Sequence, residues 1–242
     1  MPYIKIIKNR KVKKVCFIYF LFTFLIITFF ITSGCSNTYR YYRDYEYIKN
    51  FYSINPVTSV QSDNKVESDE VKKTREKIKQ IATSLLGVKS FNDGKQTFRY
   101  DCSGFVFYVY YLAGIDLYSY IVDGVSSGGV YQLYLIAQTY FSISKVSAQI
   151  GDIIIFNNTY DKNQDKKDND LYTHTAIVVD ILNDGTIVYI HKSNSGVTRG
   201  YMNLLKPDQS SSGNLTINSY LRNYGILRLS AQLFETFATF FR

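Results

Sequence analysis

The chain has 242 residues, of which 46% are hydrophobic and 20% charged, a composition typical of a globular protein and not of a disordered one. Its three cysteines are too few for a disulfide-rich scaffold. The net charge of +8 does not indicate a nucleic-acid-binding surface, because residues 1–34 hold six basic residues and no acidic one, while the rest of the chain has 22 basic and 20 acidic residues.

Residues 1–34 have the order of a secretory signal peptide. A basic segment is followed by seventeen residues without a charge, 15–31, and then by three small residues before Cys35. A cysteine at this position resembles the bacterial lipoprotein signal, in which the thiol is acylated and becomes the new N-terminus. An uncleaved anchor is the alternative, since a bilayer is spanned by roughly 18–20 apolar residues. We expect an exported, membrane-anchored lipoprotein that faces the cell wall or periplasm, lipidated at Cys35.

Residues 35–67 are predicted to form a lipid-anchored, tyrosine-rich segment and a polar tether, because Ser, Asn, Asp and Gln dominate their second half. With Cys16 in the signal and Cys35 lipidated, the mature chain keeps one free thiol, Cys102. A solitary cysteine in an exported protein is either buried and inert or a nucleophile.

Three helices are predicted after the tether. Ser68 can cap the first, whose apolar residues recur at helical spacing until Gly87. The second begins near Cys102 and ends at Gly114, and the third covers Tyr131 to Phe141.

After residue 150 the pattern changes to β-branched runs bounded by turn residues. The predicted strands are Gly151–Phe156, Thr173–Leu182, Gly185–Ser193, Val197–Asn203 and Gly225–Leu229. Helices followed by a meander of strands indicate an α+β domain over residues 68–230, with N-terminal helices packed on an antiparallel sheet of about five strands. Residues 231–242 are predicted to form a short aromatic helix that packs on this domain.

The position of Cys102 favours nucleophilic chemistry. The first backbone amides of a helix have no partner within the helix, so their dipoles should lower the pKa of a thiol there and can bind an oxyanion. Gly104 leaves room for a substrate backbone. A buried structural thiol is the alternative.

The only two histidines, His174 and His191, are candidates for the base and for its orienting partner. They lie on two strands joined by a predicted hairpin at Asn183-Asp184-Gly185. Their side chains can meet only if the hairpin loop has four residues, 181–184, or if a bulge compensates the register.

Four motifs together resemble the NlpC family of bacterial cell-wall cysteine peptidases, over roughly residues 72–229. They are Asp-Cys-Ser-Gly-Phe-Val at 101–106, Gly-Asp-Ile-Ile-Ile-Phe at 151–156, His-Thr-Ala-Ile-Val at 174–178 and Tyr-Ile-His-Lys-Ser at 189–193. The resemblance implies a papain-like fold and hydrolysis of amide bonds in peptidoglycan stem peptides, commonly at a γ-D-glutamyl–diaminopimelate bond.

The resemblance also assigns roles. Cys102 would be the nucleophile, His174 the base and His191 the third polar residue. Asp101 and Ser103 would line the substrate subsite, although Asp101 can equally serve as a helix cap. No metal or organic cofactor is implied. The expected partners are peptidoglycan peptides and, through the lipid anchor, a membrane; the protein is expected to be a monomer and not to bind nucleic acid.

Two stretches depart from the family pattern. The usual tyrosine before the cysteine is missing from residues 90–94, where Tyr100 is a possible replacement, and the polar insertion Asn157–Tyr172 could cover the cleft. Within it, residues 161–165 are similar to the start of a calcium loop, but Lys166 and Tyr172 replace the glycine and the glutamate that such a loop requires. We therefore expect a solvated loop.

Two alternative functions stay open. The related CHAP amidases share the fold and cut the muramoyl–alanine bond, but they usually have Asn or Glu where this chain has His191. A surface lipoprotein that binds wall fragments without cutting them is the other alternative, favoured by the missing tyrosine and disfavoured by the complete set of one cysteine and two histidines.

Overall fold

The computed structural model describes residues 44–51, 67–124 and 128–241. The predicted signal peptide and Cys35 lie outside these residues. Residues 44–51 are helical. The other helices are α4 (Asp69–Ser84), α5 (Cys102–Ala113), η1 (Leu117–Tyr120, a 3-10 helix) and α6 (Gly129–Tyr140). The strands are β1 (Phe91–Asn92), β2 (Thr97–Phe98), β3 (Ser142–Ser144), β4 (Ile153–Phe156), β5 (His174–Ile181), β6 (Ile187–Ser193), β7 (Gly196–Met202), β8 (Ser211–Ser212), β9 (Leu215–Thr216) and β10 (Phe234–Thr239).

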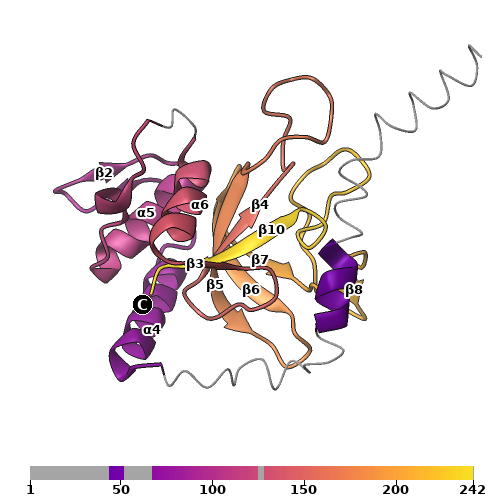
Figure 1. The fold of residues 1–242 in the computed structure, drawn as a ribbon, viewed down its shortest axis with the longest axis horizontal. Coiled ribbons are helices and arrows are strands. Elements are labelled where there is room, and N and C mark those ends of the chain that lie inside the picture. The colour runs from indigo at the N-terminus through magenta and orange to yellow at the C-terminus, as the bar shows by residue number, and fades with distance from the viewer. Residues whose placement is uncertain (1–43, 52–66, 125–127, 242) are drawn as a thin grey trace, which may run out of the picture. The chain divides into compact units, whose positions relative to one another are not determined.

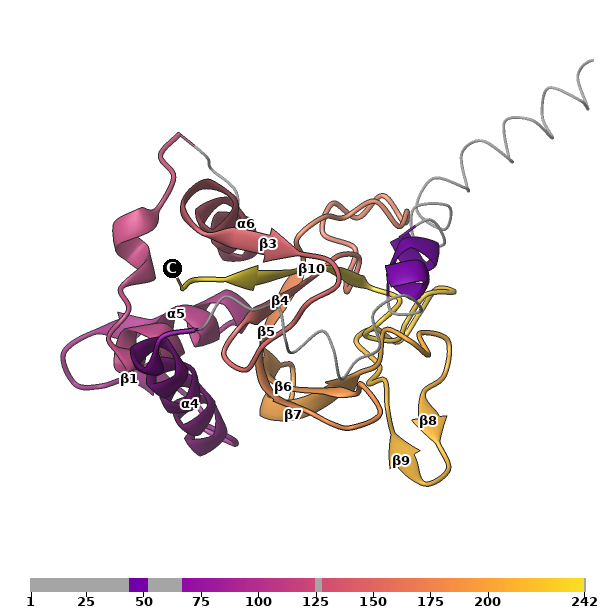
Figure 2. The same cartoon turned by 60° about the horizontal axis from the view of Figure 1, so that its bottom comes forward.

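One antiparallel sheet organises the domain. Its six strands have the order β3-β10-β4-β5-β6-β7, and two short hairpins, β1-β2 and β8-β9, lie outside it. Helices α4, α5 and α6 gather on one side of this sheet (Figures 1 and 2). The α+β class and the packing of N-terminal helices on an antiparallel sheet are thus confirmed, with six strands instead of about five.

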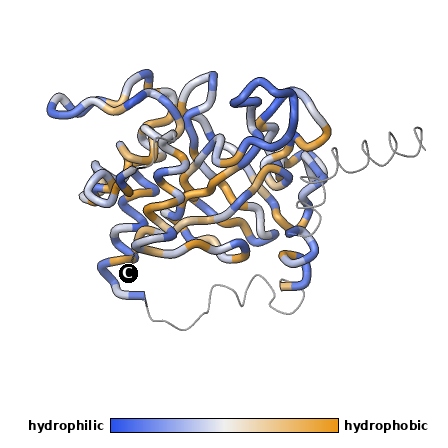
Figure 3. The backbone as a smooth tube through the Cα atoms, turned by 45° about the horizontal axis from the view of Figure 1, so that its top comes forward, coloured by the Kyte–Doolittle hydropathy of each residue, from blue (hydrophilic) through white to orange (hydrophobic). Residues whose placement is uncertain are grey.

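The core lies between helix α5 and the sheet. Nine of the twelve residues of α5 are buried. The apolar side chains of α5 form one cluster with residues of the sheet, among them Phe105, Val106, Val109, Ile177 and Ile190. Apolar stretches run through the centre of the domain in Figure 3, while the long loop at the upper right is hydrophilic. This burial holds the first turn of α5 firmly against the sheet.

The three predicted helices are confirmed, and so are the boundary signals Ser68 and Gly114, whereas α4 ends at Ser84 with Leu85 as its C-cap, before the predicted Gly87. The Ser68 side chain accepts a hydrogen bond from Val71 N at the start of α4. Gly114 ends α5 in the left-handed conformation, with φ of 97°. The described residues include no helix long and apolar enough to cross a bilayer.

Two predictions at the C-terminal end are wrong. Gly225–Leu229 is not a strand and contributes only an isolated bridge between Leu229 and Tyr220. The predicted helix over residues 231–242 is instead largely strand β10, which pairs with β3 and β4. Its phenylalanines recur at helical spacing, but the strand's interior residues are buried, and both neighbouring strands satisfy its backbone. This segment does pack on the domain, as expected.

A bulge in β5 shifts the register of the β5-β6 hairpin so that both histidines lie on one face of the sheet. Ile181 pairs with Ile187 and Asp180 with Val188, but Val178 pairs with Tyr189, so β5 has one extra residue at Val179. The turn is closed by the hydrogen bond from Leu182 N to Thr186 O. A turn of this length alone would direct the two histidines to opposite faces, and the extra residue brings them back to one face. The predicted compensating bulge is confirmed.

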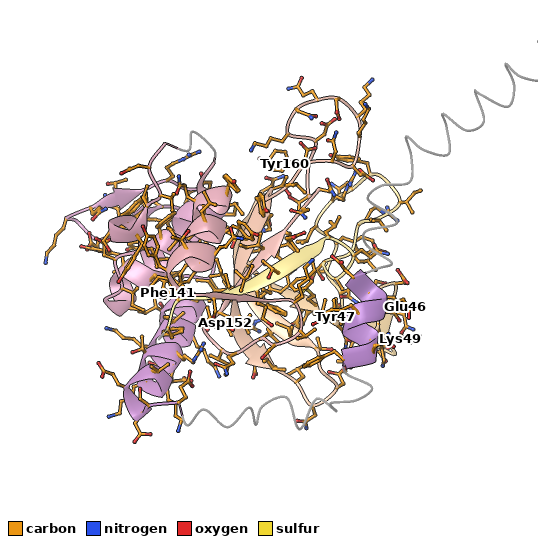
Figure 4. All side chains as sticks on the ribbon, viewed as in Figure 1. Glu46, Tyr47, Lys49, Phe141, Asp152 and Tyr160 are labelled. Carbon is orange, nitrogen blue, oxygen red and sulfur yellow. The ribbon has the colours of Figure 1, made fainter. Side chains whose placement is uncertain are left out.

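A buried ion pair joins α4 to the sheet. Arg75 Nη1 lies 2.8 Å from Asp152 Oδ1 and also donates to Ile150 O, while Arg75 Nε lies 2.6 Å from Glu67 Oε1. Asp152, which lies between α4 and the sheet in Figure 4, accepts a further hydrogen bond from Thr239 Oγ1. The Gly-Asp motif at 151–152 therefore serves the packing of the fold.

The helical residues 44–51 fall within the segment predicted as a tether. Asp44 Oδ2 lies 2.6 Å from Lys145 Nζ, and Ile48 is buried. This part of the predicted tether is therefore held on the domain by an ion pair and by apolar contacts.

Candidate active site

Cys102 is the first residue of α5. Asp101 is the N-cap, and its Oδ1 accepts hydrogen bonds from Gly104 N and Ser103 Oγ, each at 2.8 Å. Asp101 Oδ2 also forms an ion pair with Arg99 at 2.9 Å. Of its two predicted roles, the structure shows the cap directly.

Two glycines let the first turn of α5 pack closely. A Cβ at Gly104 would lie 1.9 Å from Arg99 O, so Arg99, two residues before the cap, can approach the helix only because Gly104 has no side chain. A Cβ at Gly129, the first residue of α6, would lie 2.3 Å from Ser103 Oγ. Ser103 is buried between the cap and α6, and its predicted contact with substrate stays a prediction.

Cys102 is a half-buried residue and the one free cysteine among the described residues. The backbone amides of Thr175, Ser103 and Cys102 itself act on the thiol and lower its pKa. Desolvation and the charge of Asp101 outweigh them and raise the pKa to about 11. The expectation that the helix dipole gives a low thiol pKa is therefore wrong in the free enzyme, where the thiol is protonated at neutral pH.

His174 and His191 form a hydrogen-bonded pair. His174 Nε2 lies 2.7 Å from His191 Nδ1, and the two rings are nearly perpendicular, at 80°. The ring of Phe156 stacks on His174, and Tyr189 meets His191 edge-on. The backbone amide of Thr175, the residue after His174, lowers the pKa of the Cys102 thiol, which places the start of β5 near the start of α5.

Both imidazoles are neutral near pH 7. Desolvation, followed by the charges of His191 and Lys192, holds the pKa of His174 well below its usual value. Desolvation and then Lys192 lower the pKa of His191 to about 4. A neutral imidazole has a lone pair that can accept a proton, so the histidine pair can supply a base near pH 7.

The insertion 157–172 is fixed to the domain at its base and in its far part. Its base is fixed by Thr159, whose backbone N and Oγ1 both donate to Thr173 Oγ1, and its far part by the ion pair between Asp168 and Arg222. Tyr160 lies at the base of this loop (Figure 4). Burial and then the charge of Cys102 raise the pKa of Tyr160, so its phenol lies in the electrostatic field of the sulfur.

The calcium-like residues of the insertion are used to fold the loop itself. Asp161 Oδ2 accepts from Lys166 N, Asn163 Oδ1 from Asp165 N, and Asp165 Oδ1 from Lys167 N. Among the described residues, no group of three or more His, Cys, Asp or Glu side chains could hold a metal ion.

Sequence reasoning missed three residues at this site. The backbone of Thr175 lowers the pKa of the Cys102 thiol, the charge of Cys102 raises the pKa of Tyr160 in the insertion, and Lys192 lowers the pKa of both histidines. Only Lys192 had a signal, its position directly after His191. Tyr100, the possible replacement for the missing tyrosine, donates its hydroxyl hydrogen to Val88 O, and its ring faces Lys192.

The arrangement is that of a papain-like fold: a helix begins with cysteine and packs on an antiparallel sheet that carries two hydrogen-bonded histidines. Residues 92–194 match the CHAP domain family, a family of papain-like cysteine peptidases and amidases found among relatives of the NlpC proteins. No curated protein and no solved structure gave a significant match to the chain. The CHAP family is thus the related family named above as the alternative to the NlpC family. A CHAP domain supports a role as a cell-wall hydrolase.

Proposed function

We propose that this protein hydrolyses an amide bond in the stem peptides of peptidoglycan, with Cys102, His174 and His191 as its catalytic residues. The observation that carries the proposal is the 2.7 Å contact between His174 Nε2 and His191 Nδ1, next to a cysteine at a helix N-terminus. The match of residues 92–194 to the CHAP family supports the substrate class.

The proposed mechanism starts from the protonated thiol. When His174 Nε2 carries a hydrogen and donates it to His191 Nδ1, the lone pair of His174 Nδ1 is free to take the thiol proton. Cys102 Sγ then attacks the scissile carbonyl, and the backbone amides at the start of α5 stabilise the oxyanion. The imidazolium gives its proton to the leaving amine, which leaves an acyl-enzyme. A water molecule, deprotonated by His174, hydrolyses this thioester.

The bond that we propose is the γ-D-glutamyl bond, so the enzyme would be an endopeptidase. His191 supports this choice, because CHAP amidases usually have Asn or Glu at the third position. The second candidate is cleavage of the muramoyl–alanine amide, which the CHAP match favours.

We also propose that the protein is exported and anchored to a bacterial membrane through Cys35. The support is the order of basic segment, apolar run and small residues before that cysteine. Such an anchor would hold the hydrolase, acting as a monomer, beside the cell wall.

The test is digestion of purified peptidoglycan by the full chain in detergent, followed by mass spectrometry of the products. Cleavage at γ-D-glutamyl releases a peptide and leaves L-alanyl-D-glutamate on the glycan, whereas amidase cleavage releases the whole stem. Cys102→Ala should abolish the products while its circular dichroism spectrum stays unchanged. Products that persist with Cys102→Ala, or wall binding without products in the wild type, would contradict the proposal.

A further inference from the structure

A lysine ammonium lies close to two segments of the candidate site. Lys192 follows His191 on β6, and its Nζ lies 4.4 Å from the ring centroid of Tyr100, two residues before Cys102. The same Nζ donates a hydrogen bond to Ser193 O at 2.7 Å. An ammonium has three donors, so Lys192 keeps two for a ligand.

A second ammonium lies near the same tyrosine. A Cβ placed on Gly196 would be 3.5 Å from Lys89 Nζ and 3.9 Å from Tyr100 Oη, so Gly196 provides space around this ammonium. Within the described part of the chain, no ion pair involves Lys89 or Lys192. This flank of the site therefore carries two positive charges that no carboxylate of the described residues neutralises.

The charge of Lys192 acts on the catalytic groups. It contributes to the low pKa of both His174 and His191, which places the ammonium within electrostatic reach of both rings. Since Lys192 also follows His191 directly and lies over the ring of Tyr100, an anion bound to it would lie near the candidate site and not at a remote surface.

We propose that Lys192, assisted by Lys89, binds a free carboxylate of the substrate next to the scissile amide and so selects the γ-D-glutamyl bond. This inference rests on the proposed hydrolysis of stem peptides. In a γ-D-glutamyl bond the side-chain carboxyl forms the amide, and the α-carboxylate of the same residue is free. In the muramoyl–alanine amide neither joined residue has a free carboxylate. A charge-assisted hydrogen bond to Lys192 thus distinguishes the two bonds chemically.

The experiment compares two synthetic stem peptides that differ only at this group, one with the D-glutamyl α-carboxylate and one with the α-amide. The measured quantity is the ratio of their kcat/KM values. Any effect of the lysine on the histidines is common to both substrates, so the ratio isolates recognition of the carboxylate. The variants are Lys192→Met, Lys192→Arg, which keeps the charge, and Lys95→Met as the control, because Lys95 is exposed in the β1-β2 turn.

We expect the wild type and Lys95→Met to prefer the carboxylate, Lys192→Met to lower the ratio roughly ten- to hundredfold, and Lys192→Arg to recover most of it. A ratio that Lys192→Met leaves unchanged, with cleavage of both peptides by the wild type, would overturn the role of Lys192 and leave the proposed function standing. A wild type that cleaves neither peptide but releases whole stems from peptidoglycan would overturn both the role of Lys192 and the γ-D-glutamyl assignment. No cleavage of peptides or peptidoglycan would refute the proposed function itself.

Discussion

His174 Nε2 and His191 Nδ1 lie 2.7 Å apart, on two strands whose register is shifted by one bulged residue, Val179. Neither imidazole could reach the other without that residue, because side chains of a strand alternate between the two faces of a sheet. Contact between the two proposed catalytic histidines therefore depends on a backbone irregularity near the far end of β5, and each histidine can be tested separately.

His191→Ala should lower kcat roughly a hundredfold, because His174 loses the partner that fixes its tautomer and orientation. His191→Asn should keep more activity than the alanine variant, since an amide oxygen can still accept a hydrogen bond from His174 Nε2. The measurement is steady-state kinetics of stem-peptide cleavage. Equal activity of the alanine and asparagine variants would mean that His191 does not act by accepting this hydrogen bond.

The protein should lose stability as the pH falls from about 6.5 to about 4. The folded-state pKa of His191 is lowered to about 4 and that of His174 is also lowered, so the unfolded chain binds protons in this range that the folded protein does not. Each such histidine contributes a slope of about 1.4 kcal/mol per pH unit. Urea unfolding at pH 7 and pH 5 measures this change. His191→Asn should show a shallower dependence on pH than Cys102→Ala, which keeps both histidines; equal slopes would contradict the assignment.

Cys102 should react slowly with iodoacetamide at pH 7 in the free enzyme, and faster as the pH approaches its pKa of about 11. Asp101→Asn should increase the rate at pH 8, because it removes a negative charge that raises this pKa but keeps an oxygen that can cap α5. Asp116→Asn is the matched control, since Asp116 caps η1 in the same way. A rapid, pH-independent reaction of the wild type would show instead that the thiolate is already formed.

Arg75→Ala should lower the free energy of unfolding by about 3–5 kcal/mol, because it leaves the carboxylate of Asp152 buried without its cation. Lys72→Ala on the same helix is the control: its pair with Asp69 is exposed and should contribute less than about 1 kcal/mol. Chemical denaturation of the two variants gives both values. A similar loss in both would mean that burial does not set the strength of the Arg75 pair.

Gly129→Ala should impair both folding and activity, because its Cβ would overlap Ser103 Oγ next to the nucleophile. Gly128→Ala should be tolerated, since a Cβ there meets nothing within 4 Å. Thermal unfolding and peptide cleavage are measured for both variants. The comparison distinguishes a packing requirement at Gly129 from a general effect of substitutions at the start of α6.

The sequence by itself determined the local elements and the chemical groups of this protein. Caps and helical spacing predicted the three helices, β-branched runs predicted β4 to β7, and the motifs around Cys102, His174 and His191 indicated a thiol hydrolase. These signals are local, because they depend on residues within one turn of a helix or one strand.

Only the tertiary structure decided what depends on distant partners. Residues 234–239 have apolar spacing compatible with a helix, yet they form β10 because strands β3 and β4 pair with their backbone and bury their side chains. The pKa of Cys102 follows from the desolvation of its thiol and from Asp101, not from the helix dipole alone. The approach of Lys192 to Tyr100 likewise joins two segments that are remote in sequence, because packing energies, unlike capping signals, arise only when the chain has folded.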